Sequence, residues 1–127
     1  MKIPPKLKYT NDHEWVDVSG ATASVGITDF AQGELGDIIF LDVTVSVNDE
    51  VNQGDVLGTI EAVKTVSEII CPISGRITEI NTGINDLPSI INQDPYDRGW
   101  MIKIEPSNAD ELANLMDATS YTDLIGQ

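Results

Sequence analysis

Lys64 is the only Lys or Arg between Tyr9 and Gly75, a stretch that contains twelve acidic residues. The lysine amine is a frequent target of acylation, which removes its charge. A lysine without cationic neighbours can be selected by a modifying enzyme through its position and local shape. The alternative is a solvated surface charge, which is the ordinary state of a lysine. The local pattern leaves a modification site and a plain surface charge both open.

The run "IEAVKTVSEI" around Lys64 predicts a hairpin in preference to a helix. Glu61 and Glu68 would pair with Lys64 on a helical face, but such pairs are worth only about 0.2–0.5 kcal/mol each. β-branched residues, which are stiff at χ1 and favour strands, fill the run: Val63, Thr65, Val66, Ile69 and Ile70. A strand, a tight turn and a return strand are therefore expected, with Lys64 at or near the bend.

The other side chains with reactive chemistry are isolated. His13 is the only histidine, and because histidine titrates near neutral pH it invites a general-base role. No Ser or Cys can be assigned to it from the sequence, which favours a structural or binding role. Cys71 precedes Pro72 at the end of an apolar strand and is expected to be a buried, inert thiol. One His, one Cys and scattered acids predict no catalytic residue and no metal site.

The elements that must position Lys64 are mostly short strands. "EWVDV" and "ATASVGI" alternate apolar and polar residues around a turn at Ser19-Gly20, which predicts a hairpin. "ITDFAQGELG" predicts one short helix with Thr28 as its cap and Gly36 after its end. A turn is expected at Gly54. Further strands are expected in "DIIFLDVTVSV", "SGRITEI" and "GWMIKIE", and the segment 81–99 is expected to be a loop.

The C-terminal end changes character. In "SNADELANLM", Ser107 stands three residues before Asp110, near a capping box, and apolar residues follow at helical spacing. "ATSYTDLI" predicts one or two further helical turns. The expected organisation is a single domain over 1–127, with a β-rich body over about 9–105 and a helical tail over about 107–125.

Composition excludes several classes of partner. The net charge of -14 argues against binding nucleic acid or an anionic membrane surface. No apolar run is long enough for a membrane span, and "MKIPPKLKYT" lacks the apolar centre of a signal peptide. One cysteine cannot form an internal disulfide, which fits a reducing compartment. A cytoplasmic location is therefore expected.

Beyond these patterns, the chain resembles the H proteins of the glycine cleavage system. The matching runs occur in family order over nearly the whole chain: "YTNDHEWV", "VGITDFAQGELGDIIF", "IEAVKTVSEI", "CPISGRITEIN", "PSIINQDPYDRGWMIKI" and "ELANLMDATSYTDLI". The resemblance implies a mainly β, lipoyl-domain-like fold, a barrel-sandwich hybrid of two small antiparallel sheets with a short internal helix and C-terminal helices. It also implies that lipoic acid is joined by an amide bond to Lys64, which is displayed on a hairpin.

The resemblance implies a carrier and not an enzyme. In the family, the lipoyl arm receives the aminomethyl group of glycine from a glycine decarboxylase that uses pyridoxal phosphate. The arm passes this group to a tetrahydrofolate-dependent aminomethyltransferase and is reoxidised by an FAD-containing dihydrolipoyl dehydrogenase. A lipoate ligase or lipoyl transferase attaches the arm. The family-like oligomeric state is a monomer.

The family also suggests which residues hold the loaded arm. A Glu before the Trp and an acid four residues after the lysine take this role in relatives, and these positions are Glu14 and Glu68 here. Asp12 stands where relatives often have a small polar residue, so it adds or alters a contact. His13 lies in the same "HEW" stretch and is expected to be structural or to face the arm. The competing interpretation is that Asp12, Glu14 and Glu68 are solvated surface acids.

Three rival functions share the same hairpin. A biotinyl carrier typically has Met on both sides of its lysine, whereas Val63 and Thr65 flank Lys64 here. A lipoyl relay protein, which donates lipoate to other enzymes or to a lipoyl-linked signalling system, would have the same attachment site and stays open. A stand-alone enzyme is disfavoured because no catalytic cluster accompanies the lysine. Thr65 and the 44–48 loop depart from the family pattern and bear on partner choice more than on fold.

Overall fold

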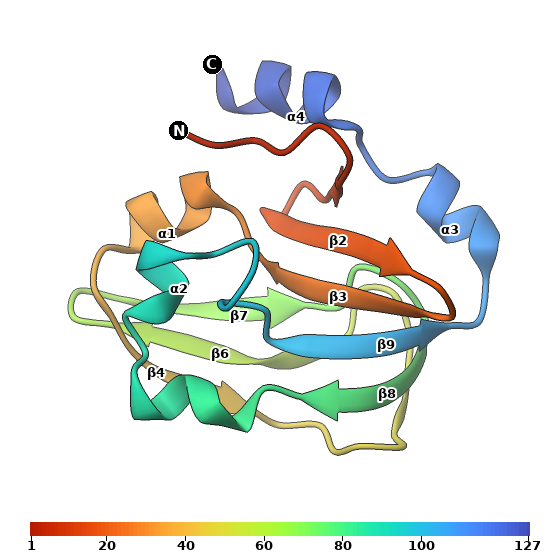
Figure 1. Ribbon diagram of the computed structural model, residues 1–127, viewed down its shortest axis with the longest axis horizontal. Coiled ribbons are helices and arrows are strands. Elements are labelled where there is room, and N and C mark those ends of the chain that lie inside the picture. Colours follow the sequence, from red (N-terminus) through yellow and green to blue (C-terminus); the bar gives the residue numbers. More distant parts are fainter.

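The computed structural model describes all 127 residues, and two antiparallel sheets form its body (Figure 1). One sheet has six strands in the order β1-β2-β3-β9-β8-β5, and the other has three in the order β4-β6-β7. The strands are β1 (Lys8–Tyr9), β2 (Glu14–Ser19), β3 (Thr22–Ile27), β4 (Ile38–Val43), β5 (Glu50–Val51), β6 (Val56–Ala62), β7 (Val66–Ile70), β8 (Gly75–Ile80) and β9 (Ile102–Pro106). The expected mainly β fold of two antiparallel sheets is confirmed, and neither sheet closes into a barrel.

The helices are short and lie at the edges of the sheets (Figure 1). They are α1 (Asp29–Leu35), the 3-10 helix η1 (Thr82–Asp86), α2 (Ile90–Gln93), α3 (Ala109–Ala113) and α4 (Ala118–Ile125). α1 and α2 lie together at one end of the molecule, while α4 lies beside the N-terminal segment.

The main core draws its side chains from both sheets. Nineteen buried residues form it, including Val25 and Ile102 from the six-stranded sheet and Leu41, Ile60 and Ile69 from the three-stranded one. Each such side chain contributes about 1.5–3 kcal/mol when it is fully buried. This shared core fixes the three-stranded sheet, and with it the β6–β7 hairpin, against the rest of the molecule.

Two local predictions are confirmed. β2 and β3 form a hairpin with Val18 opposite Ala23, and Gly20 in its turn has a φ of +63°, which glycine adopts without strain. α1 begins as expected, because the Thr28 hydroxyl accepts a hydrogen bond of 3.2 Å from the Ala31 N–H. The helix ends at Gly36, whose φ is +78°.

Two other predictions are wrong in detail. The segment 81–99 is not all loop, because η1 and α2 form within it and bury Ile84, Ile90 and Ile91 in the main core. Ser107 does not cap α3. The Asn108 side chain is the cap and accepts from the Asp110 N–H, while the Ser107 N–H donates to the Ser74 carbonyl oxygen of the loop before β8. Tertiary pairing thus overrides the local capping pattern.

A second, aromatic cluster packs the C-terminal tail against the body. Tyr9, Trp15 and Tyr121 are its buried members, and the rings of Tyr9 and Tyr121 stack with centroids 4.7 Å apart. The Trp15 indole N–H donates to the Pro95 carbonyl oxygen at 2.9 Å. The Tyr96 hydroxyl accepts from the Asp29 N–H, which ties the loop before β9 to the start of α1. Tyr96 therefore anchors this loop to α1.

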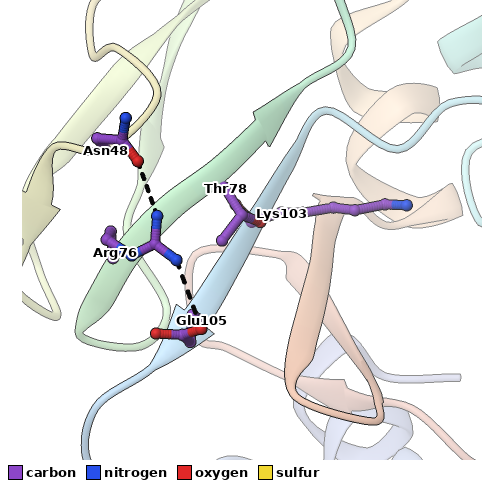
Figure 2. Close-up of polar contacts among 5 residues, drawn as sticks. All are labelled: Asn48, Arg76, Thr78, Lys103 and Glu105. Carbon is purple, nitrogen blue, oxygen red and sulfur yellow. Dashed lines mark hydrogen bonds and ion pairs between the residues drawn. The ribbon is translucent and has the colours of Figure 1, made fainter.

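A polar cluster on the outer face of β8 and β9 holds the loop before β5 (Figure 2). Arg76 donates to the Asn48 side-chain oxygen at 2.7 Å and lies 3.5 Å from the Glu105 carboxylate. Thr78 donates to the Lys103 carbonyl oxygen at 3.2 Å. Because the ion pair is exposed, it contributes about 1 kcal/mol at most. The hydrogen bond from Arg76 to Asn48 holds the loop before β5 against β8.

Gly58 allows β4 and β6 to approach closely. A Cβ at Gly58 would overlap the backbone carbonyl oxygen of Asp42 and lie 3.0 Å from the Val43 Cα. We therefore expect Gly58→Ala to lower the free energy of unfolding by about 1–3 kcal/mol. The matched control is Gly33→Ala in α1, where a Cβ meets nothing within 4 Å and should stabilise the helix by about 0.5–1 kcal/mol. Urea unfolding of both variants measures the difference, and equal stabilities would contradict this account of the β4–β6 contact.

Candidate functional site

Lys64 lies in the tight turn between β6 and β7, which projects from one end of the molecule (left in Figure 1). The turn is closed by a hydrogen bond of 2.8 Å from the Ala62 N–H to the Thr65 carbonyl oxygen. It is also tied to the residue before β4, because the Val63 N–H donates to the Asp37 carbonyl oxygen at 3.0 Å. The hairpin predicted from the sequence is confirmed. The Lys64 side chain is exposed and makes no hydrogen bond or ion pair.

A cavity of about 350 Å³ lies between the start of β2, the helix α1 and the strand β7. Four residues singled out from the sequence, Asp12, His13, Glu14 and Glu68, line it together. Lys64 does not line it, but it precedes Glu68 by four residues. At a strand rise of about 3.3 Å per residue, this spacing corresponds to roughly 13 Å along the hairpin. A flexible group on Lys64 would therefore have an acidic cavity within a short reach.

Glu14 is the buried carboxyl of the site. Only 1% of its surface is exposed, although it belongs to a strand whose neighbours are apolar. The Thr10 hydroxyl donates to Oε1 at 2.7 Å, and the Ile70 N–H donates to Oε2 at 3.4 Å. The pKa of Glu14 is raised to about 8, mainly by burial; the hydrogen bonds from Thr10 and Ile70 lower it and the charge of Asp12 raises it, and both effects are smaller than that of burial. The carboxyl is therefore mostly protonated at neutral pH in the empty cavity.

Glu14 also faces a second cavity of about 260 Å³. This cavity lies between the Thr10–Asp12 loop, the Gly54 turn and the segment that joins α3 to α4. Asp12 and Glu14 line both cavities, so they form the wall between them. Glu14 is buried and is therefore not a solvated surface acid, whereas Asp12 and Glu68 have exposed side chains. A role of these three acids in holding a loaded arm stays a prediction.

His13 is held on the cavity wall from several sides. Its φ of +68° is uncommon for a residue other than glycine. The Thr28 N–H donates to its carbonyl oxygen at 3.0 Å, and its Nδ1 lies 2.9 Å from the Tyr121 hydroxyl. Its ring also lies 5.0 Å from that of Phe30. The Tyr121 contact ties the C-terminal helix to the cavity and supports a structural role. A role in contacting a bound arm stays a prediction.

The sequence did not indicate several of the residues that line this cavity. α1 contributes a wall that the sequence did not single out: Phe30, Ala31, Glu34 and Leu35. Ile27, Ile60 and Ser67 complete the lining. The spacing of the α1 residues indicates one helical face. No local signal, however, tells that this face lies across a cavity from β7, because the two segments are more than thirty residues apart in the sequence.

Other candidate chemistry is absent from this site. Cys71 is buried, and burial raises the pKa of its thiol to about 12, so it is an inert member of the core. No group of three or more His, Cys, Asp or Glu side chains is arranged to hold a metal ion. None of the helices has the length and apolar character needed to cross a membrane.

The raised pKa of Glu14 makes stability depend on pH. Between the ordinary value of 4.5 and about 8, the folded chain binds more protons at Glu14 than the unfolded chain does. The free energy of unfolding therefore falls as pH rises through this window. Glu14→Gln, which is permanently neutral, should be the more stable protein by a few kcal/mol at about pH 9, and this advantage should shrink toward about pH 5.5.

Urea unfolding at a series of pH values above the isoelectric point of about 4.1 measures the effect. Glu68→Gln is the control, because it changes an exposed carboxyl of the same cavity and is expected to alter stability by about 0.5 kcal/mol or less. A stability difference between Glu14→Gln and wild type that does not vary with pH would contradict the buried carboxyl described above.

Comparisons with known proteins in sequence and in structure all lead to one family. The family model described as glycine cleavage H-protein matches residues 7–127. The chain is similar to the glycine cleavage system H proteins of Staphylococcus saprophyticus and Staphylococcus haemolyticus, with 47% and 46% identity, and each match covers all of both chains. It is also similar to the crystal structure of a glycine cleavage system H protein from Mycobacterium marinum, at 38% identity and a TM-score of 0.89. That match covers 98% of this chain and 100% of the other.

These matches cover nearly the whole chain, and the sequence and structure comparisons both lead to glycine cleavage H proteins. The resemblance drawn from the sequence runs is thereby confirmed. This chain belongs to the glycine cleavage H-protein family.

Proposed function

We propose that this chain is the lipoyl-bearing carrier of a glycine cleavage system and that lipoate is joined by an amide bond to Nζ of Lys64. Membership of the H-protein family over residues 7–127 supports the carrier role. The observation that carries the assignment to Lys64 is its exposure, without any ion pair, in the turn of the β6–β7 hairpin, whose strand β7 lines the acidic cavity. We also propose that residues 1–127 act as one lipoyl-type domain, because one core joins both sheets and also receives Leu112 and Leu115 from the tail.

Lys64 suits this attachment because of what surrounds it. Its amine has no competing partner, and the hydrogen-bonded turn presents it at a fixed place. Lipoate, when attached, supplies a dithiolane that takes up and releases the aminomethyl group and two electrons. Tethering keeps the cargo at an effective concentration on the order of millimolar near the next site. The chain itself supplies position and recognition, as a carrier subunit and not as a catalyst.

The carboxyl groups of the cavity fit a cationic cargo. An aminomethyl group carries a protonated amine, which is attracted to carboxylates in a partly buried site. Glu14 lies on the inner wall of the cavity, with Glu68 and Asp12 as exposed side chains of its lining. A nearby cation favours the charged form of a carboxyl, so the approaching amine would lower the pKa of Glu14 and convert it to a carboxylate. Glu14 would thus be neutral in the empty cavity and charged when cargo is present.

The partners follow from the proposed role. They are the pyridoxal-phosphate-dependent glycine decarboxylase, the tetrahydrofolate-dependent aminomethyltransferase, the FAD-containing dihydrolipoyl dehydrogenase and the ligase or transferase that attaches lipoate. With a net charge of -14, the chain favours partner surfaces that are basic.

The attachment site is tested by co-expression with a lipoate ligase in the presence of lipoate, followed by intact mass spectrometry. We expect a gain of one lipoyl group in the wild-type chain and none in Lys64→Arg. Lys103→Arg is the matched control, because it changes a half-buried lysine on β9 and should leave the gain intact. An unmodified wild-type chain beside an active ligase, or a modified Lys64→Arg chain, would overturn the assignment.

The carrier role needs a separate test. The lipoylated chain is incubated with the decarboxylase, the aminomethyltransferase, the dehydrogenase and labelled glycine. Label transferred to tetrahydrofolate supports glycine cleavage, whereas a chain that accepts lipoate and only donates it to other apoproteins would be a lipoyl relay protein. Because attachment and transfer are measured separately, the failure of one is distinguishable from the failure of the other.

A further inference from the structure

A network of hydrogen bonds through the buried Tyr121 hydroxyl leads from the C-terminal helix to the cavity. Tyr121 of α4 is fully buried, and its hydroxyl lies 2.7 Å from Thr28 Oγ1 and 2.9 Å from His13 Nδ1. Thr28 Oγ1 also accepts from the Ala31 N–H. The other ring nitrogen of His13, Nε2, has no hydrogen-bond partner, and His13 lines the cavity. The hydroxyl of Tyr121 is thus the link between α4 and the histidine.

The direction of each hydrogen bond in this network follows if every buried donor must have an acceptor. If Tyr121 donated to Thr28, the Thr28 hydroxyl proton would have no acceptor, because its oxygen has no other partner besides the Ala31 N–H. A buried donor without an acceptor is rare and costly. If instead Thr28 donates to Tyr121 and Tyr121 donates to His13 Nδ1, every proton is used. Neutral His13 then carries its own proton on Nε2.

We propose that Tyr121 is a positioning residue that holds neutral His13 in the Nε2–H tautomer, so that the cavity wall presents a fixed N–H donor. The backbone supports this arrangement. The Thr28 N–H donates to the His13 carbonyl oxygen, while the Thr28 hydroxyl donates to the Tyr121 oxygen and the Tyr121 hydroxyl donates to His13 Nδ1. The positive φ of His13 is therefore held at the main chain and at the ring.

The tautomer decides which part of a loaded arm His13 can bind and which part the carboxyl groups must bind. This consequence rests on the proposed carrier function. An Nε2–H donor does not accept a hydrogen bond from a protonated amine. The amine would therefore be met by the carboxyl groups of Asp12, Glu14 and Glu68, while His13 would meet an electron-rich atom such as the arm's amide oxygen or sulfur. The assignment of the tautomer itself does not require the arm, so it can be tested on the unmodified chain.

The test is long-range proton–nitrogen NMR of the imidazole, which is simple here because His13 is the only histidine. Spectra are recorded about two pH units above the ordinary histidine pKa of about 6.5, where an imidazole is neutral. We expect the wild-type chain to show a protonated Nε2 and an unprotonated Nδ1. A protonated Nδ1 in the wild-type chain would overturn the proposal.

Two variants test whether the Tyr121 hydroxyl sets the tautomer of His13. Tyr121→Phe should raise the ratio of the Nδ1–H to the Nε2–H tautomer about fivefold, which corresponds to the loss of one net hydrogen bond. Tyr9→Phe is the matched control, because it removes a buried hydroxyl of the same cluster that donates to the Pro4 carbonyl oxygen and not to His13. An unchanged ratio in Tyr121→Phe would overturn the proposal.

The wild-type chain grown with 3-fluorotyrosine provides a measurement that does not depend on the folding of a variant. Fluorination makes the tyrosine hydroxyl a stronger donor with little change in shape. We expect the Nδ1 resonance to move toward its protonated position, because Tyr121 donates to this nitrogen. A resonance that does not move would show that Tyr121 donates elsewhere.

Discussion

The buried carboxyl of Glu14 joins the two sheets at the cavity. Glu14 belongs to β2 of the six-stranded sheet, and it accepts from the Ile70 N–H at the end of β7 in the three-stranded sheet. A carboxyl inside an apolar core is costly unless it is hydrogen-bonded and neutral, and here Thr10 and a raised pKa meet these conditions. The arrangement keeps a latent negative charge beside the hairpin that carries Lys64. A cation that entered the cavity would favour the charged form of Glu14, which is the basis of the proposed response to cargo.

Rigidity and mobility are separated in this molecule. The shared core, the close β4–β6 contact at Gly58 and the hydrogen bonds of the β6–β7 turn hold the hairpin in place. The exposed side chain of Lys64 has no such restraint. A carrier needs this combination, because a fixed base defines the region that an attached arm can reach, and a free arm visits several partners. The C-terminal helix adds to the rigid part, since Tyr121 stacks on Tyr9 and binds His13 at the cavity wall.

Local sequence patterns predicted the elements that local physics determines. The β-branched run around Lys64 indicated a hairpin, and Thr28 and Gly36 bounded α1 as expected. The sequence did not reveal that Asn108, and not Ser107, caps α3, because the Ser107 backbone pairs with the distant Ser74. The burial of Glu14 and the α1 wall of the cavity were equally hidden, since they arise from contacts between distant segments. Family resemblance supplied Glu14 and Glu68, and the structure adds that they line one cavity.

The measurement that tests the central claim most directly is a carbon-13 NMR titration of the Glu14 side-chain carboxyl, first in the unmodified chain and then in the lipoylated chain that carries the aminomethyl group. This account predicts a midpoint near pH 8 in the unmodified chain and a clearly lower midpoint when the cargo is present. A midpoint near the ordinary value of 4.5 in the unmodified chain would contradict the buried, neutral carboxyl. A midpoint that the cargo leaves unchanged would contradict the role of this cavity in holding a cation.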